Sequence, residues 1–431
     1  MTTGSADESA YPARWHDLIP GPDFALGTVA ALLGSTATAQ TAIETSLVEG
    51  ALDRLDRRLL DVLPRYRVVA SNGDLVLPAD HERPAVLRML EELLRQLVGV
   101  DGRLHPRDHR CADLGDIPSF PDDPAALRWF ITEFATIHAA QRLAAAMGED
   151  VLVRQFGEVS WAAARVSGRV REMLSLQTLA AEAAERSDHP AASIARARCC
   201  WVLLELGRHD EALAAAEYAL DLAERHGHNR SRATALHALG EAYHALGRHG
   251  DAVETYRNAM KFDVESVRLA ADGTTTPLPL SSIGLRWMST AATHLATGWP
   301  AQAVLAATIA VSCIAVDNRR HRDLARARAI LGRALLAHDR PDAAIPVLTL
   351  AAAALDPTVD RHALADVRAL LGEAALATGS PTKAAQHFHA AATLFEQADR
   401  PDRARTLRNR DSAGAPAPSP LPPTDHGEAR T

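Results

Sequence analysis

Residues 233–259, ATALHALGEAYHALGRHGDAVETYRNA, decide the fold of this chain of 431 residues. In the first half, apolar and small residues recur at spacings of three and four, as on one face of a helix: Leu236, Leu239, Gly240 and Tyr243. The second half has the same spacing at Ala252, Tyr256 and Ala259. Gly247 lies between the two halves, where a glycine ends a helix. The stretch therefore predicts two helices joined by a tight turn.

The same pattern recurs along the chain. The small residue that opens each second helix recurs in steps of 40, 51, 41 and 40 residues, at Ala212, Ala252, Ala303, Ala344 and Ala384. Turn residues precede these positions by five, at Gly207, Gly247, Gly298, Asp339 and Gly379, and prolines suited to a helix start stand at Pro300, Pro341 and Pro381. The extra length of the long step falls in Asp263 to Ser281, which is predicted to be a loop. A degenerate unit at about 154–188, hinged near Gly168, brings the repeats to six helix pairs.

The pattern L-x2-L-G-x2-Y…A-x3-Y…A resembles the tetratricopeptide repeat (TPR), with Val264 where the family has its late proline. This resemblance implies a right-handed superhelix of helix pairs, an α-solenoid. Small residues there let paired helices approach closely, so we expect Gly240, Gly332 and Gly372 at the closest approach within their pairs. Such a scaffold holds another molecule, and we expect a protein or peptide partner that the sequence does not name.

Residues 13–80 are predicted to form a small winged-helix-like module. Ala25 to Leu33 and Thr36 to Glu49 have the spacing of two short helices. The runs LDRLD, RYRVV and LVL within residues 51–77 have the composition of short strands, with a turn signal at Asn72-Gly73.

Five short motifs are similar to the C-terminal half of the antibiotic-regulatory activators of the SARP and STAND class. They are GPDF at 21–24, AALLG at 30–34, LVEGAL at 47–52, RYR at 65–67 and ALRWFITE at 126–133. The resemblance implies a winged helix, a helical linker region and TPR repeats, with a role in transcriptional regulation. Those activators usually also carry an NTPase module, which is absent from this sequence. Neither Lys261 nor Lys383 follows a glycine as a P-loop lysine does, so we expect this chain to bind no nucleotide.

The sequence thus predicts an all-α fold in five parts. A flexible N-terminus at 1–12 precedes the winged-helix-like module at 13–80 and a helical linker region at 81–150, with helices at Pro84 to Val98 and Pro124 to Met147. TPR-like repeats, about six helix pairs, fill 151–408. Residues 409–431 are rich in Pro, Ala and Ser and are predicted to be a disordered tail.

Composition and charge favour a soluble cytoplasmic protein. Hydrophobic residues make up 47% of the chain and charged residues 23%, while the net charge of -8 provides no overall attraction for nucleic acid. The helix predicted at 36–49 has no Lys or Arg and carries Glu44 and Glu49, which argues against DNA binding. The longest apolar run, Ala303 to Val316, is too short to span a membrane, and no signal peptide is recognised. The four scattered cysteines, Cys111, Cys199, Cys200 and Cys313, are predicted to be structural thiols.

The candidate partner-binding residues lie on the first helices of the repeats. His237, Glu241 and His244 share one helix face, and the same register gives Trp201, Met288, Arg333 and Glu373. The alternatives are a solvated polar face, packing between repeats or, from the spacing alone, a metal site.

Enzyme motifs such as G-x-S-x-G and H-E-x-x-H are absent, so no catalytic residue, metal or cofactor is predicted. The expected function is that of a regulatory or scaffold protein that binds a protein or peptide. A DNA-binding transcriptional regulator with a ligand-sensing TPR domain is the alternative, and an accessory enzyme is a weaker one.

Overall fold

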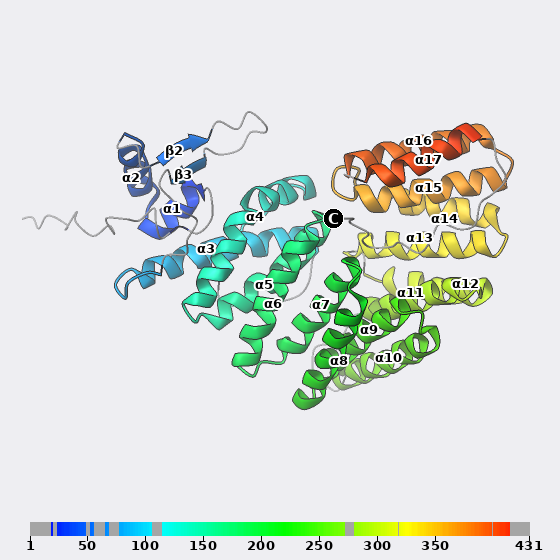
Figure 1. Cartoon of the computed structure of the whole chain (residues 1–431), viewed down its shortest axis with the longest axis horizontal. Helices are drawn as coiled ribbons and strands as arrows, with labels where there is room; N and C mark the ends of the chain where they lie inside the picture. The colour runs from blue at the N-terminus through cyan, green and yellow to red at the C-terminus, as the bar shows by residue number, and fades with distance from the viewer. Residues whose placement is uncertain are drawn as a thin grey trace, which may run out of the picture. The chain divides into compact units, whose positions relative to one another are not determined.

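The computed structural model describes residues 19, 24–48, 52–55, 65–68, 77–105, 114–271, 280–317, 319–398 and 400–413. The chain divides into two compact units (Figure 1). Unit 1 comprises Met1–Ser167 and Ser175–Asp188, and unit 2 comprises Gly168–Leu174 and His189–Thr431. Helices make up most of the described chain in both units.

Unit 1 combines a small sheet with longer helices. In chain order it contains β1 (Phe24–Ala25), α1 (Leu26–Leu33), α2 (Thr36–Val48), β2 (Leu52–Leu55), β3 (Arg65–Val68), α3 (Arg83–Leu104), α4 (Asp123–Ala146), α5 (Asp150–Val166) and most of α6 (Val170–Arg186). Strand β3 is central and pairs antiparallel with both β1 and β2. Gly168, at the hinge expected between α5 and α6, has a left-handed φ of 71°.

Two details of unit 1 differ from the expectations. Helix α3 runs to Leu104, beyond the expected end at Val98, because its buried stripe continues through Val100 to Leu104. In the predicted run LVL, Leu77 belongs to no strand, and Leu75, Val76 and the Asn72-Gly73 turn lie outside the described residues.

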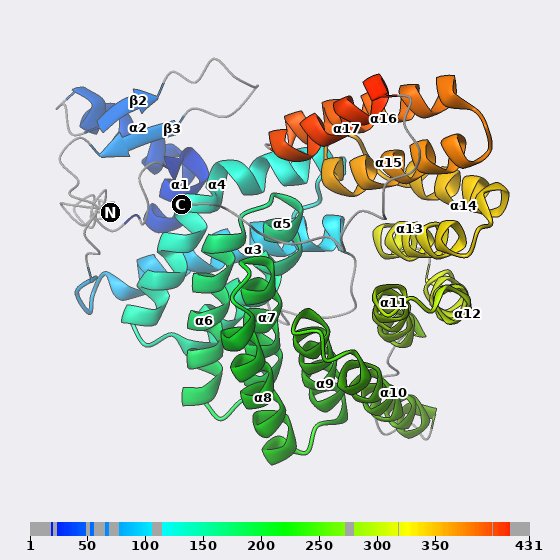
Figure 2. The ribbon, with the colours of Figure 1, turned by 45° about the vertical axis from the view of Figure 1, so that its right-hand side comes forward.

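From His189 on, the described residues of unit 2 form a stack of five helix pairs closed by one further helix. The first helices are α7 (Ala191–Glu205), α9 (Asn229–Ala245), α11 (Leu280–Ala296), α13 (His321–Ala337) and α15 (Arg361–Ala377). The second helices are α8 (His209–His226), α10 (His249–Ala271), α12 (Pro300–Ile314), α14 (Pro341–Ala353) and α16 (Pro381–Gln397). Helix α17 (Pro401–Ala413) packs on α16. Within this unit, Figure 2 shows the first helices on the inner side of the curve and the second helices on its outer side.

The turns inside the pairs confirm the register taken from the sequence. Each of the five turn residues has a left-handed φ, between 56° and 73°: Gly207, Gly247, Gly298, Asp339 and Gly379. A glycine adopts this conformation without a Cβ penalty, and aspartate is among the residues that tolerate it. Pro300, Pro341 and Pro381 begin α12, α14 and α16 as predicted.

Close approach within the pairs is also confirmed. A Cβ on Gly240 would lie 2.3 Å from Cε1 of Tyr256, and one on Gly332 would lie 2.4 Å from Cδ2 of Leu348. At Gly372 the corresponding distance, to Cε1 of Phe388, is 2.5 Å. Each glycine therefore makes room for one large side chain of the paired helix.

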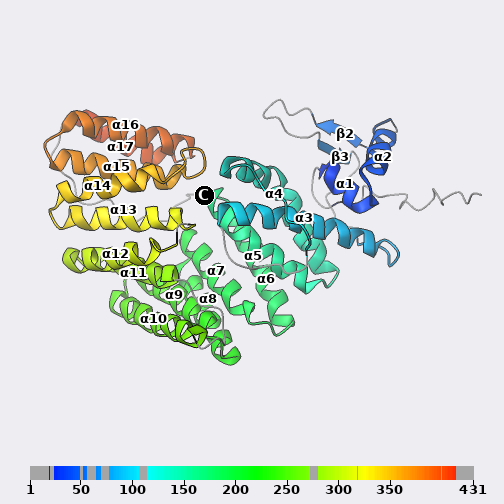
Figure 3. The ribbon, with the colours of Figure 1, turned by 180° about the vertical axis from the view of Figure 1, so that it is seen from behind.

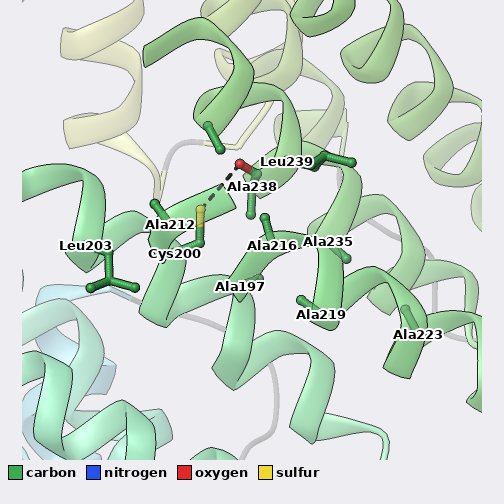
Figure 4. Packing of buried hydrophobic residues seen from close by; sticks show 11 residues of the cluster. Ala197, Cys200, Leu203, Ala212, Ala216, Ala219, Ala223, Ala235, Ala238 and Leu239 are labelled. Atoms are coloured by element: carbon green, nitrogen blue, oxygen red, sulfur yellow. Dashed lines mark hydrogen bonds between the residues drawn. The ribbon is translucent and has the colours of Figure 1, made fainter. Parts of the chain in front are cut away.

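Small side chains form the core where α7, α8 and α9 meet (Figure 4). Alanines such as Ala197, Ala216 and Ala238 are fully buried and let the backbones pack closely. The thiol of Cys200 donates to the carbonyl oxygen of Ala238 at 3.4 Å, and Cys199 beside it is a buried thiol. Both thiols are thus part of the packing. Cys313 is half-buried and free, and Cys111 lies outside the described residues.

Two predicted boundaries are wrong. The loop assigned to Asp263 to Ser281 begins later, because α10 continues to Ala271. The segment 263–271 consists largely of residues compatible with a helix, and Asp263 is fully buried within it. The predicted tail also begins too early, since residues 409–413 belong to α17.

Helix α17 has one buried and one charged face. Ala404 and Leu407 are buried in the same cluster as Phe388 and Phe395 of α16. Arg405 and Arg408 on its other side are exposed. Arg403 donates to Asp366 of α15 at 2.8 Å and lies over the ring of Phe395. The helix thus covers the apolar end of the stack with a polar surface.

Candidate partner-binding face

Four of the predicted residues occupy equivalent positions on four first helices. Each lies 11 residues before the small residue that opens the second helix of its pair, and each is half-buried: Trp201 of α7, Glu241 of α9, Arg333 of α13 and Glu373 of α15. The following residue is buried in each of these helices. We call these four the ladder residues. They combine an aromatic ring, a cation and two carboxylates along one side of unit 2.

The other predicted residues are placed differently. Met288 is 6% exposed and packs in the cluster formed by α11, α12 and α13. His237 is 9% exposed and makes edge-on ring contacts with Trp201 and Tyr256, with centroids 5.6 and 5.8 Å apart. His244 is half-buried. Packing between repeats therefore occupies His237 and Met288, and the ladder residues keep more of their surface.

Polar side chains join α9 to α11, and we call this contact the α9–α11 junction. His237 Nε2 lies 2.9 Å from Ser289 Oγ and 3.4 Å from a carboxylate oxygen of Glu241, and its Nδ1 lies 3.2 Å from Nη1 of Arg286. A guanidinium can only donate, so Nδ1 of His237 accepts and the neutral ring carries its proton on Nε2. That proton points towards Ser289 and Glu241.

His244 makes a second contact across the same junction. Its Nδ1 lies 2.9 Å from Oγ1 of Thr293, and that hydroxyl donates its single hydrogen to the carbonyl oxygen of Ser289 at 3.0 Å. Nδ1 of His244 is therefore the donor to Thr293. The ring of His249 lies beside that of His244, with their centroids 5.2 Å apart.

A buried ion pair lies beside the junction. Arg286 Nε of α11 is 3.4 Å from Oδ2 of Asp263 in α10, and both side chains are almost completely buried. Burial lowers the pKa of Arg286 and raises the pKa of Asp263, while the charge of each partner opposes the shift of the other. Asp263 and Arg286 therefore depend on each other to remain charged.

The pKa values at the junction favour neutral histidines and a charged Glu241. Burial and the nearby Arg286 lower the pKa of His237, and burial lowers the pKa of His244. Burial alone would raise the pKa of Glu241, but hydrogen bonds from His237 and Ser289, and the positive charges that His237 and His244 carry when they are protonated, outweigh it and lower that pKa to about 2. At neutral pH the junction thus holds a carboxylate beside two neutral imidazoles.

Charge also surrounds Arg333 further along the stack. Burial lowers the pKa of its guanidinium, and Asp366 and Glu373 of α15 act in the opposite direction. Arg403 of α17, which pairs with Asp366, adds a second cation. The inner side of α13 and α15 is therefore a place where charges of both signs lie close together.

The sequence did not reveal three residues of this region. Arg286 and Ser289 stand in an apolar-looking first helix, and Asp263 was assigned to a loop. The only available signal was a charged residue at a position otherwise occupied by core residues. Their pairing depends on the contact of three helices, which spacing along one helix does not specify.

Residues 202–263, which run from the last turn of α7 into α10, match the family model of the tetratricopeptide repeat. The solved structures with similar folds include a Rap protein complexed with competence and sporulation factor, at 12% identity over 92% of this chain and 94% of that chain, with a TM-score of 0.49. They also include the nearly identical TPR-like repeats of a kinesin light chain from Podosopora anserina, at 18% identity over 52% and 99% of the two chains, with a TM-score of 0.37. A thermophilic TPR protein from Thermus thermophilus is 20% identical over 52% and 98%, with a TM-score of 0.34.

Among the curated proteins, no sequence matches this one. Within the described ranges, no helix combines the length and the apolar character needed to cross a membrane. In that same part of the chain, no group of three or more His, Cys, Asp or Glu residues is arranged to hold a metal ion.

Proposed function

We propose that this protein is a non-catalytic regulatory or scaffold protein that binds a protein or peptide partner on the inner face of unit 2. The observation that carries the proposal is the set of ladder residues, which stay partly exposed at equivalent positions while their neighbours are buried. Aromatic and arginine side chains dominate the energy of many interfaces, so Trp201 and Arg333 are the expected anchors. Glu241 and Glu373 add negative charge that favours a partner with basic side chains.

A peptide-display selection against the full chain tests this function. A library of random peptides is selected on the wild-type protein, and the enriched peptides are measured by calorimetry against variants. Trp201→Ala and Arg333→Ala should each weaken binding at least tenfold with the helical circular dichroism unchanged. Val264→Ala, at a 39% exposed position of the second helix α10, is the matched control and should bind like the wild type. Selected peptides that bind both inner-face variants normally would contradict the proposal.

We further propose that residues 24–68 form a winged-helix-like module that contacts protein rather than duplex DNA. The order strand, helix, helix, strand, strand, with β3 between β1 and β2, supports this fold. The absence of Lys and Arg from α2 argues against a recognition helix for DNA, because duplex binding depends on neutralising phosphates. With the resemblance to SARP and STAND activators, this arrangement supports a cytoplasmic role in regulation.

A further inference from the structure

Residues of α8, α9 and α10 line a cleft of about 320 Å³ in unit 2, which we call the α8–α10 cleft. The three helices lie side by side in the stack (Figure 3). Sites for small molecules have volumes of about 300 to 1,000 Å³, so the cleft suits a small ligand. No ladder residue belongs to its lining, which consists of Leu220, Glu224, Arg232, Leu236, Asn258, Lys261 and Phe262.

The sequence of the repeat explains the room at this place. In the TPR pattern W-x2-L-G-x2-Y, a tryptophan stands three residues before the leucine that corresponds to Leu239. This chain has the smaller Leu236 at that position. Leu236, Leu220 and Phe262 line the cleft and are all half-buried. An apolar group that covers their remaining surface would be stabilised by its removal from water.

Two cations line the same cleft. The guanidinium carbon of Arg232 lies 5.6 Å from the centroid of the Phe262 ring. Arg232 donates two long hydrogen bonds, both of 3.5 Å, to Oδ1 of Asn229 and to the carbonyl oxygen of Glu224. Lys261 donates to Oδ1 of Asn258 at 2.9 Å. Within the described ranges, neither cation therefore has a carboxylate as its hydrogen-bond partner.

We propose that the α8–α10 cleft binds a small monocarboxylate with an apolar tail. The carboxylate pairs with Arg232 and Lys261, and a guanidinium can donate to both of its oxygens. The tail covers the three apolar side chains of the lining. Two cations and the carboxylate of Glu224 give the lining a net charge of +1. This charge matches a monoanion better than a phosphate monoester, which carries about -1.5 to -2 at neutral pH.

Calorimetry of the full chain with octanoate tests the proposal, because octanoate combines one carboxylate with an apolar tail. Octanoate should bind saturably with a dissociation constant of about 1 mM or below, as expected of a ligand of this size. Two further probes separate the contributions of charge and tail. Octanol, which has no charge, and acetate, which has no tail, should each bind about tenfold more weakly or not at all.

Variants of the cations locate the binding. Arg232→Gln should weaken octanoate binding about tenfold, because Arg232 is half-buried and a hydrogen bond between charged groups is strong there. Lys261→Gln should weaken it about threefold, since ion pairs at exposed positions contribute less. Arg257→Gln is the matched control, because Arg257 is an exposed cation of α10 that does not line the cleft. It should bind octanoate like the wild type.

Three results would overturn the proposal. The first is a wild-type protein without saturable octanoate binding up to about 5 mM. The second is octanol that binds as tightly as octanoate, because the cations would then take no part. The third is octanoate binding that is unchanged in both Arg232→Gln and Lys261→Gln. Circular dichroism verifies that the helices of each variant are intact. Trp201→Ala should bind octanoate normally, so the cleft and the peptide-binding face are tested independently.

Discussion

Replacing Gly240 by alanine should destabilise the protein although alanine favours helices. The added Cβ would lie 2.3 Å from Cε1 and 2.6 Å from Cδ1 of Tyr256, whereas carbon atoms in contact are about 3.5 to 4 Å apart. Tyr256 is fully buried, so its ring has no free space into which to move. Overpacking of this kind costs about 1 to 3 kcal/mol, against a helix-propensity gain of about 1 kcal/mol. The expected net loss is up to about 2 kcal/mol.

Urea unfolding followed by circular dichroism measures this effect. Gly250→Ala is the matched control, because Gly250 lies in the paired helix and a Cβ there would have no neighbour within 4 Å. Its free energy of unfolding should be equal to or above that of the wild type. Gly332→Ala and Gly372→Ala should behave like Gly240→Ala. If Gly240→Ala is as stable as Gly250→Ala, the close approach of α9 and α10 does not limit the side chain at that position.

Three further predictions concern charge. Arg286→Met should lower the free energy of unfolding, measured in urea, by about 3 to 5 kcal/mol because Asp263 is left unpaired. Adding Asp263→Leu to this variant should restore much of the lost free energy. An Arg286→Met variant as stable as the wild type would refute the pairing. Burial lowers the pKa of His237 and of His244, so as the pH falls below about 6.5 the unfolded chain takes up protons before the folded chain does. The free energy of unfolding should therefore decrease as the pH is lowered, and it should decrease less steeply in His237→Gln. A free energy of unfolding that does not change between pH 7 and 5 would contradict this. The chain should give no mobility shift with its native upstream DNA at physiological salt and no heat of ATP binding in calorimetry, and a sequence-specific shift or micromolar ATP binding would reverse those expectations.

Local spacing was enough to predict the repeats of unit 2. Gly240 and Tyr243 fix one helix face, and Gly247 fixes the turn, because these features depend on residues a few positions apart. The same spacing placed Gly332 and Gly372 correctly. Helical periodicity therefore carries most of the information about this fold.

Contacts between helices could not be predicted in the same way. His237 was predicted to face a partner, yet it is only 9% exposed and contacts Ser289 and Arg286 of α11. The extension of α10 to Ala271 was hidden because the following residues, DGTTTPLPLS, have the composition of a loop. Strand β1 has only two residues, too few for an alternating pattern. Each of these features depends on a tertiary partner that the local sequence does not identify.

Helix α17 has a consequence for how copies of this protein avoid uncontrolled assembly. A helical stack without a closing helix would present the apolar side of its last pair, here including Phe388 and Phe395, to the solvent. Such an open end can add the first pair of another copy, and repetition of that step produces a filament. Because α17 places Arg405 and Arg408 over this end, head-to-tail growth is blocked there, and a chain truncated before Pro401 should form fibres or precipitate at concentrations where the full chain stays in solution.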